Sequence, residues 1–182
     1  MHASFESTYS DERSPVRHAS APLARVNGRA PVAEPEHEHT WKEQVVRLLK
    51  DSLIKELVCV VRYNNLSGDV QTQPLISAEF LLHAYEELAH AHRLAQRIAQ
   101  LGGELEYSPN LLLRMGQATH QQHRDLQSMI QANLSSEYRA ITQYTEIMSQ
   151  LDAEDVATRR LLQEIVDEER AHAEELKLWL VN

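Results

Sequence analysis

Apolar residues recur along most of the chain at the three- and four-residue spacing of one face of an α-helix. Four such stretches can be followed, over about residues 40–66, 74–101, 117–150 and 152–180. Neither glycine nor proline occurs inside any of them, apart from Pro74 in the first turn of the second. The pattern therefore predicts an all-α chain of four long helices.

The residues that flank these stretches fit helix ends. Thr40 begins a capping box at the first helix, and Asp152 can cap the fourth. The second helix ends at Gly102-Gly103. The two outer connections are short and the middle one is longer. We therefore expect a four-helix bundle with one long crossover between the second and third helices.

The first 39 residues differ from the rest of the chain. They hold four of the six prolines and show no apolar period. They also carry four arginines and six acidic residues, so this segment is not a basic arm. We expect residues 1–39 to be a disordered or loosely ordered extension, and residues 40–182 to form the bundle.

Each predicted helix places one glutamate on its apolar face. Glu56, for example, has apolar residues three and seven positions before it, and four and seven positions after it. An isolated carboxylate in a helix core is costly, or stays protonated. Something positive should therefore compensate the four core glutamates, which are Glu56, Glu87, Glu137 and Glu169.

Histidines offer that compensation through a bound metal. His90 follows Glu87 by three residues, and His172 follows Glu169 by three, so each pair projects from one helix face. Two helices that each give one glutamate, with two that each give Glu-x-x-His, supply the ligands of di-iron or di-manganese carboxylate bundles. Carboxylate and imidazole ligands suit iron or manganese. We expect two iron ions per subunit, or manganese in their place.

Matched spacings strengthen this interpretation. The first pair of core glutamates is 31 residues apart and the second pair 32, and a tyrosine follows Glu56 and Glu137 by seven residues in each case. The halves of the chain are therefore related helix pairs. The alternative is a bundle of the same fold without metal, whose acids are surface charges.

Four segments resemble bacterioferritin and its relatives in the ferritin-like di-iron superfamily. They are residues 55–63 (KELVCVVRY), 86–94 (EELAHAHRL), 97–103 (RIAQLGG) and 167–172 (DEERAH), and the likeness covers about residues 45–180. The resemblance implies that Glu87 and Glu169 bridge two irons. It implies that Glu56 with His90, and Glu137 with His172, are the terminal ligands, with Tyr63 beside the site. It further implies a ferroxidase that oxidises Fe(II) with O2 or H2O2 and stores the product in a hollow homo-oligomer.

Two departures from bacterioferritin change the expectation. Leu88 stands where that family has its haem-ligating methionine, so we expect no haem of this type. The sequence ends ten residues after His172, without the family's short fifth helix. We therefore expect a 12-subunit shell, or a smaller oligomer, rather than a 24-subunit shell.

Composition excludes several classes of function and of metal site. The formal net charge of −9 argues against DNA binding. The single cysteine, Cys59, excludes an internal disulfide framework or a cysteine-rich metal site, and we interpret it as an inert core thiol. No apolar run suits a membrane span or a secretory signal, so we expect a cytoplasmic protein.

Other functions share the same ligands. A di-metal peroxidase, catalase or oxygenase without storage would use the same six residues, and a bundle that serves only as an interaction module would bind no metal. His83 and His92 flank the second-helix motif without an assigned role.

Overall fold

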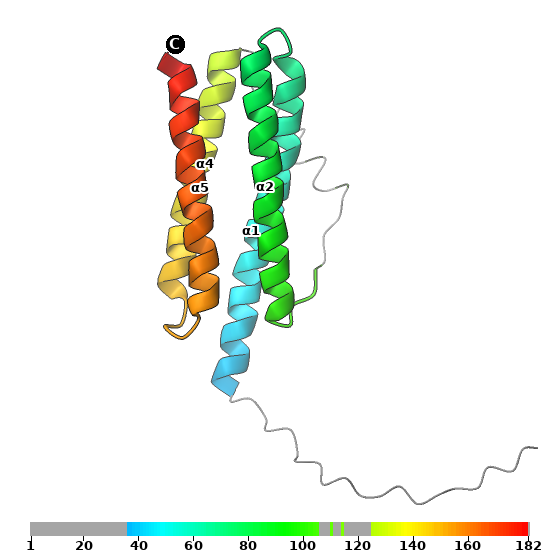
Figure 1. Cartoon of the computed structure of the whole chain (residues 1–182). Helices are drawn as coiled ribbons and strands as arrows, with labels where there is room; N and C mark the ends of the chain where they lie inside the picture. Colours follow the sequence, from blue (N-terminus) through cyan, green and yellow to red (C-terminus); the bar gives the residue numbers. More distant parts are fainter. Residues whose placement is uncertain (1–35, 106–109, 111–113, 115–124, 182) are drawn as a thin grey trace, which may run out of the picture. The chain divides into compact units, whose positions relative to one another are not determined.

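Four long helices make up most of the part of the chain that the computed structural model describes, which is residues 36–105, 110, 114 and 125–181 (Figure 1). The described residues contain no strand, so the prediction of an all-α four-helix bundle is confirmed. None of these helices combines the length and the apolar character needed to cross a membrane. The helices are α1 (Glu36–Asp69), α2 (Pro74–Gln100), α4 (Leu126–Gln150) and α5 (Val156–Val181).

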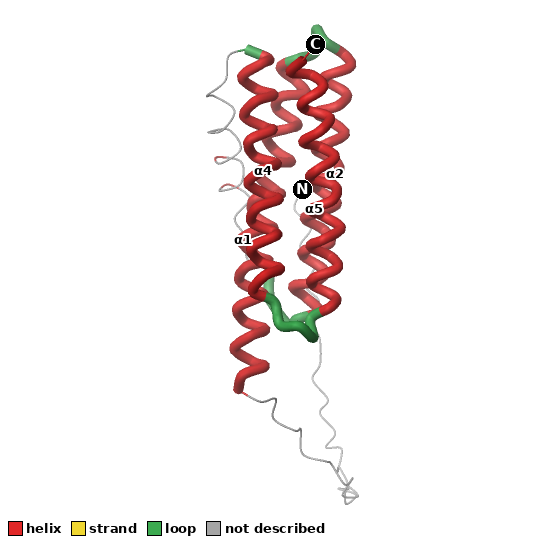
Figure 2. Tube along the Cα trace, turned by 90° about the vertical axis from the view of Figure 1, so that its left-hand side faces the viewer, coloured by secondary structure: helices red, strands yellow, loops and turns green. Residues whose placement is uncertain are grey.

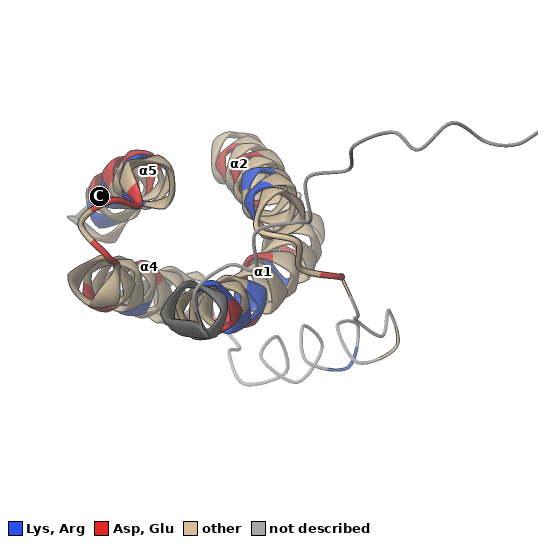
Figure 3. Ribbon diagram, turned by 90° about the horizontal axis from the view of Figure 1, so that it is seen from below, with Lys and Arg blue, Asp and Glu red and all other residues tan. Residues whose placement is uncertain are grey.

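The helices form two antiparallel hairpins. Short turns join α1 to α2 and α4 to α5 (Figure 2), whereas residues 101–125 lie between α2 and α4 in the sequence. Viewed along the bundle, α4 lies beside α1 (Figure 3). Hydrogen bonds join Tyr63 to Glu137 and Tyr144 to Glu56, so α1 and α4 run antiparallel. Similar bonds between α2 and α5 complete the bundle.

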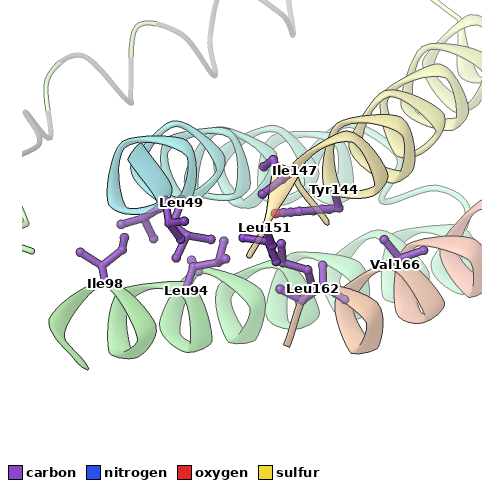
Figure 4. Packing of buried hydrophobic residues seen from close by; sticks show 12 residues of the cluster. Leu49, Leu94, Ile98, Tyr144, Ile147, Leu151, Leu162 and Val166 are labelled. Carbon is purple, nitrogen blue, oxygen red and sulfur yellow. The ribbon is translucent and has the colours of Figure 1, made fainter. Parts of the chain in front are cut away.

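The apolar core is divided into two clusters along the helices. One cluster includes Leu49, Leu94, Ile147 and Leu162 (Figure 4). The other lies toward the opposite end of the bundle and consists of Tyr63, Leu66, Val70, Ile76, Phe80, Ala84, Met129, Ile130 and Leu176. In every helix, the core glutamate falls in sequence between the residues of the two clusters. A polar layer therefore lies at mid-height, with apolar packing above and below it.

The helix ends differ from the expectation at three places. Thr40 lies inside α1, which begins at Glu36, directly after Pro35; proline is common at a helix start. The third helix begins at Leu126 rather than near residue 117, because Asp125 is extended and its carboxylate accepts a hydrogen bond from the Ser128 amide at 2.9 Å. The predicted residues 117–124 lie outside the described part.

The fourth helix is capped by Asp155, and not by Asp152 as the sequence suggested. The Asp155 carboxylate accepts a bond from the Thr158 amide at 3.0 Å and another from the Arg97 guanidinium of α2 at 2.7 Å. Asp152 instead accepts from the Glu154 amide within the turn. The end of α2 follows the prediction, since Gly102 adopts a positive φ of 80° just after it.

This difference can be tested by unfolding the metal-free protein in denaturant. Asp155→Ala should lower the free energy of unfolding by about 2–4 kcal/mol, because it removes a helix cap and a partly buried charge-assisted hydrogen bond from Arg97. The matched change Asp152→Ala removes an exposed turn contact and should cost less than about 1 kcal/mol. Equal losses in the two variants would contradict the assignment of the cap.

Candidate metal centre

The structure brings the six predicted ligands together in the polar layer. One glutamate comes from α1 and one from α4, whereas α2 and α5 each contribute a Glu-x-x-His pair. None of the six is more than 3% exposed. The inward-facing residues are Glu56, Glu87, His90, Glu137, Glu169 and His172.

These residues form two groups of four that overlap. Within each group, one ligand atom from every member lies within 4.8 Å of the others. The first group contains Glu56 and His90, and the second contains Glu137 and His172. Both groups contain Glu87 and Glu169. Two carboxylates therefore lie where they could contact two ions, whereas the other four side chains each face one position.

The Nδ1 atoms of the histidines face this overlap. His90 Nδ1 lies 3.2 Å from a carboxylate oxygen of Glu169 and 3.5 Å from one of Glu87. His172 Nδ1 lies 3.5 Å from Glu169 and 3.9 Å from Glu87. The arrangement is nearly twofold, as the matched spacings in the sequence predicted.

A second ring of polar side chains holds the first in place. The Nε2 atoms of the two histidines point away from the centre, that of His90 to Glu168 at 2.8 Å and that of His172 to Glu86 at 2.9 Å. Glu168 is also paired with Arg93. Because each outer carboxylate accepts from an Nε2–H, Nδ1 is the nitrogen that faces inward.

The tyrosines bind the glutamates crosswise. The hydroxyl of Tyr63 on α1 donates to Glu137 on α4, and the hydroxyl of Tyr144 on α4 donates to Glu56 on α1. Both tyrosines are no more than 2% exposed. Burial raises the pKa of each phenol, so both keep their protons at neutral pH.

Without metal, the cluster balances its charge with shared protons. Burial and neighbouring carboxylates raise the pKa of Glu87 and raise that of Glu137 to about 8. Burial disfavours a charged imidazole, but hydrogen bonds to carboxylates outweigh it, raising the pKa of His172 to about 9 and that of His90 far above its ordinary value. Although burial opposes it, the nearby imidazoles of both histidines hold the pKa of Glu169 below its usual range.

Several buried atoms of the centre have no partner among the described residues. Both carboxylate oxygens of Glu87 and of Glu169 lack a hydrogen bond, as do the Nδ1 atoms of His90 and His172. Buried polar atoms in folded proteins are almost always satisfied, so this group needs an explanation. The unpartnered atoms are oxygen and imidazole donors that face one another, and the donor set fits two divalent ions.

A pocket between α1 and α4 reaches this centre from the side. It has a volume of about 500 Å³, and both Glu56 and Glu169 line it. Arg62 in its wall donates hydrogen bonds to Ser136 and to the sulfur of Cys59. Cys59 is partly buried, and desolvation raises the pKa of its thiol, which fits an unreactive group.

Sequence reasoning missed several residues of the second ring. Glu86 and Glu168 directly precede Glu87 and Glu169, so the doubled Glu-Glu before each histidine was the signal that could have found them. Tyr144 could have been found as the counterpart of Tyr63. His83 could not, because its hydrogen-bond partner, Glu175, lies on another helix.

Comparison with known proteins agrees with this geometry. Residues 46–182 match the ferritin-like domain family. Bacterioferritin from Desulfovibrio desulfuricans is 28% identical over 134 residues, which cover 72% of this chain and 71% of that protein.

Two solved structures share the fold. The dodecameric thioferritin of Bacteroides fragilis, a bacterioferritin-related protein, gives a TM-score of 0.67 at 24% identity, covering 79% of this chain and 89% of that one. The Desulfovibrio desulfuricans bacterioferritin, solved with its di-iron site in different catalytic states, gives 0.66 at 21% identity, covering 79% and 82%. The chain belongs to the ferritin-like family, and its relatives include the bacterioferritins.

Proposed function

We propose that this protein binds two iron ions per subunit and oxidises Fe(II) with O2 or H2O2, for iron storage or detoxification. The observation that carries the proposal is the pair of overlapping ligand groups, whose unpartnered buried atoms face one another. Membership of the ferritin-like family supports the same function. Two Fe(II) ions held there could each supply one electron to the oxidant.

In this proposal, Glu87 and Glu169 bridge the ions. Their four oxygens need partners, and each residue belongs to both ligand groups. Glu56 with His90 would complete one position, and Glu137 with His172 the other. Manganese would suit the same donors, and its use would favour a different di-metal oxidoreductase.

The second ring has a separate task. Glu168 and Glu86 fix the tautomer and the ring orientation of the two histidines, so that Nδ1 faces the metal. The two tyrosine hydroxyls hold one oxygen of Glu56 and of Glu137, which leaves the other oxygen for an ion. The resemblance to bacterioferritin implied that Tyr63 lies beside the site, and in this proposal Tyr63 acts through Glu137.

The pocket between α1 and α4 offers the oxidant a path. A small neutral molecule could reach Glu56 and Glu169 through it. The charged residues of its walls are three cations and three acids, Lys55, Arg62, Arg139, Glu56, Glu146 and Glu169. We assign this pocket to the oxidant.

Assembly into a homo-oligomer belongs to the same proposal. On α2, Leu75, Leu82, Tyr85 and Leu88 are all between 48% and 73% exposed, an apolar surface that subunit contacts could cover. The related thioferritin of Bacteroides fragilis is a dodecamer. Light scattering should give the mass of twelve chains; twenty-four would correct the expected size, and a monomer or dimer would contradict storage in a shell.

The ligand assignment predicts the effect of removing a bridging carboxylate. Glu87→Ala or Glu169→Ala should abolish most rapid Fe(II) oxidation, by about a hundredfold or more, because each residue contacts both ions. The purified wild type should contain about two metal ions per chain. The matched control is Glu174→Ala, which removes an exposed carboxylate of α5 that pairs with Lys177. Wild-type rates in both bridging variants would reject the assignment.

The shared protons predict how metal stabilisation depends on pH. The pKa of Glu137 rises from 4.5 to about 8 on folding, and that of His172 from 6.5 to about 9. These protons stabilise the metal-free protein fully at a pH below the pKa values of the unfolded state. The stabilisation is lost as the pH rises through the pKa values of the folded state. Metal needs the deprotonated forms. Bound Mn²⁺ should stabilise the fold by about 3 kcal/mol at roughly a hundredfold excess over Kd. The rise in Tm that it causes should therefore grow from about pH 6 to about pH 8.5.

A paired substitution serves as the control for this measurement. Glu137→Leu together with Tyr63→Phe removes a buried carboxyl and its hydroxyl partner, so no donor is left unsatisfied. The metal-free fold should remain intact or gain stability. Its gain in Tm from Mn²⁺ should be smaller at every pH; a gain equal to that of the wild type would mean that Glu137 is not a ligand.

A further inference from the structure

A second cluster of metal-ligating side chains lies next to the centre, on the side of α2 and α5. It consists of Glu79 and His83 from α2 and Glu175 from α5. One ligand atom from each lies within 4.8 Å of the other two. The cluster shares no residue with the six ligands of the proposed di-metal centre.

The histidine of this cluster is buried while its partners are not. His83 is fully buried, and its Nε2 lies 2.9 Å from Glu175 and 3.8 Å from Glu79. Its Nδ1 has no partner in the described part of the chain. The side chains of Glu79 and Glu175 are 25% and 44% exposed. Both glutamates also line a small pocket with Leu178 and Trp179. An ion could therefore arrive from solvent at the two carboxylates, which both lie close to the buried imidazole.

The charges of the cluster are not neutralised by a basic residue. Within the described ranges, neither Glu79 nor Glu175 forms an ion pair with a lysine or arginine. The other half of the bundle differs at the equivalent place. Three residues after His90 stands Arg93, which neutralises Glu168, whereas three residues after His172 stands Glu175. At this place the bundle therefore has two carboxylates beside a histidine instead of an arginine–glutamate ion pair.

Contacts connect the cluster to the centre. The ring of His83 stacks on that of His172, with centroids 4.3 Å apart and an angle of 23°. His83, Glu86 and His172 also form a group whose ligand atoms lie within 4.8 Å of one another. Ligand atoms therefore continue from Glu79 and Glu175 at the surface, through His83 and Glu86, to a terminal ligand of the centre.

We propose that Glu79, His83 and Glu175 form a third divalent-cation site, which passes Fe(II) inward to the di-metal centre. The binding itself stands on this cluster alone, whereas the transfer rests on the proposed function. The pocket between α1 and α4 lies on another side of the site, so metal and oxidant would approach by different routes.

Equilibrium dialysis of the full-length protein against Co²⁺ alone, followed by metal analysis, tests the binding. The wild type should take up three ions per chain, the third more weakly than the first two. Glu79→Gln with Glu175→Gln should remove only the third ion. Glu174→Gln, which changes the neighbouring exposed carboxylate of α5, should bind as the wild type does. A wild type that takes up only two ions, or a double variant that takes up three, overturns the proposal.

The same dialysis separates this proposal from the proposed function. Glu87→Ala should lose ions of the centre and keep the third. If Glu87→Ala binds as many ions as the wild type does, the assignment of the di-metal centre is contradicted. The double variant still tests the third site by itself.

Initial rates of Fe(II) oxidation test the transfer. At limiting Fe(II), the double variant should be slower by about tenfold, because an acidic surface site no longer concentrates the cation. At saturating Fe(II), its rate should return to that of the wild type. Equal rates at every concentration, with the third ion lost, would overturn the role in transfer.

Discussion

The burial of four carboxylates at mid-height is the constraint on which this bundle depends. Apolar clusters on both sides of the layer keep water away, so the charge has to be balanced from within. Two histidines and two tyrosines supply the available donors, and the two glutamates shared by both ligand groups still keep unpartnered oxygens. Burial and the closeness of the other carboxylates explain why Glu87 and Glu137 retain protons in the metal-free chain.

The layer is also where the two hairpins meet. Each tyrosine bonds to a glutamate of the other hairpin, and each histidine of α2 or α5 bonds to an outer glutamate of the facing helix. Ions bound there would tie all four helices together. Metal binding and the stability of the bundle are therefore linked, and a ligand substitution affects both.

Much of this arrangement could be predicted from the sequence, because it repeats at helical spacing. A glutamate within an apolar stripe must face the core, and a histidine three residues later must share that face, so the six inward residues follow from each helix alone. The cap of α5 could not be predicted in this way. Asp152 and Asp155 look alike locally, and the choice between them is made by Arg97 of α2. The contacts of His83 also depend on how α5 approaches α2.

The pairing of Arg93 with Glu168 has a consequence for the electronic character of the centre. The guanidinium withdraws negative charge from the carboxylate behind His90, whereas Glu86 behind His172 has no arginine partner among the described residues. In the proposed metal-bound form, the His172 imidazole would therefore have more anionic character and be the stronger electron donor to an ion. Two irons with identical ligand types would then differ in reduction potential, and the ion beside His172 would be the easier one to oxidise.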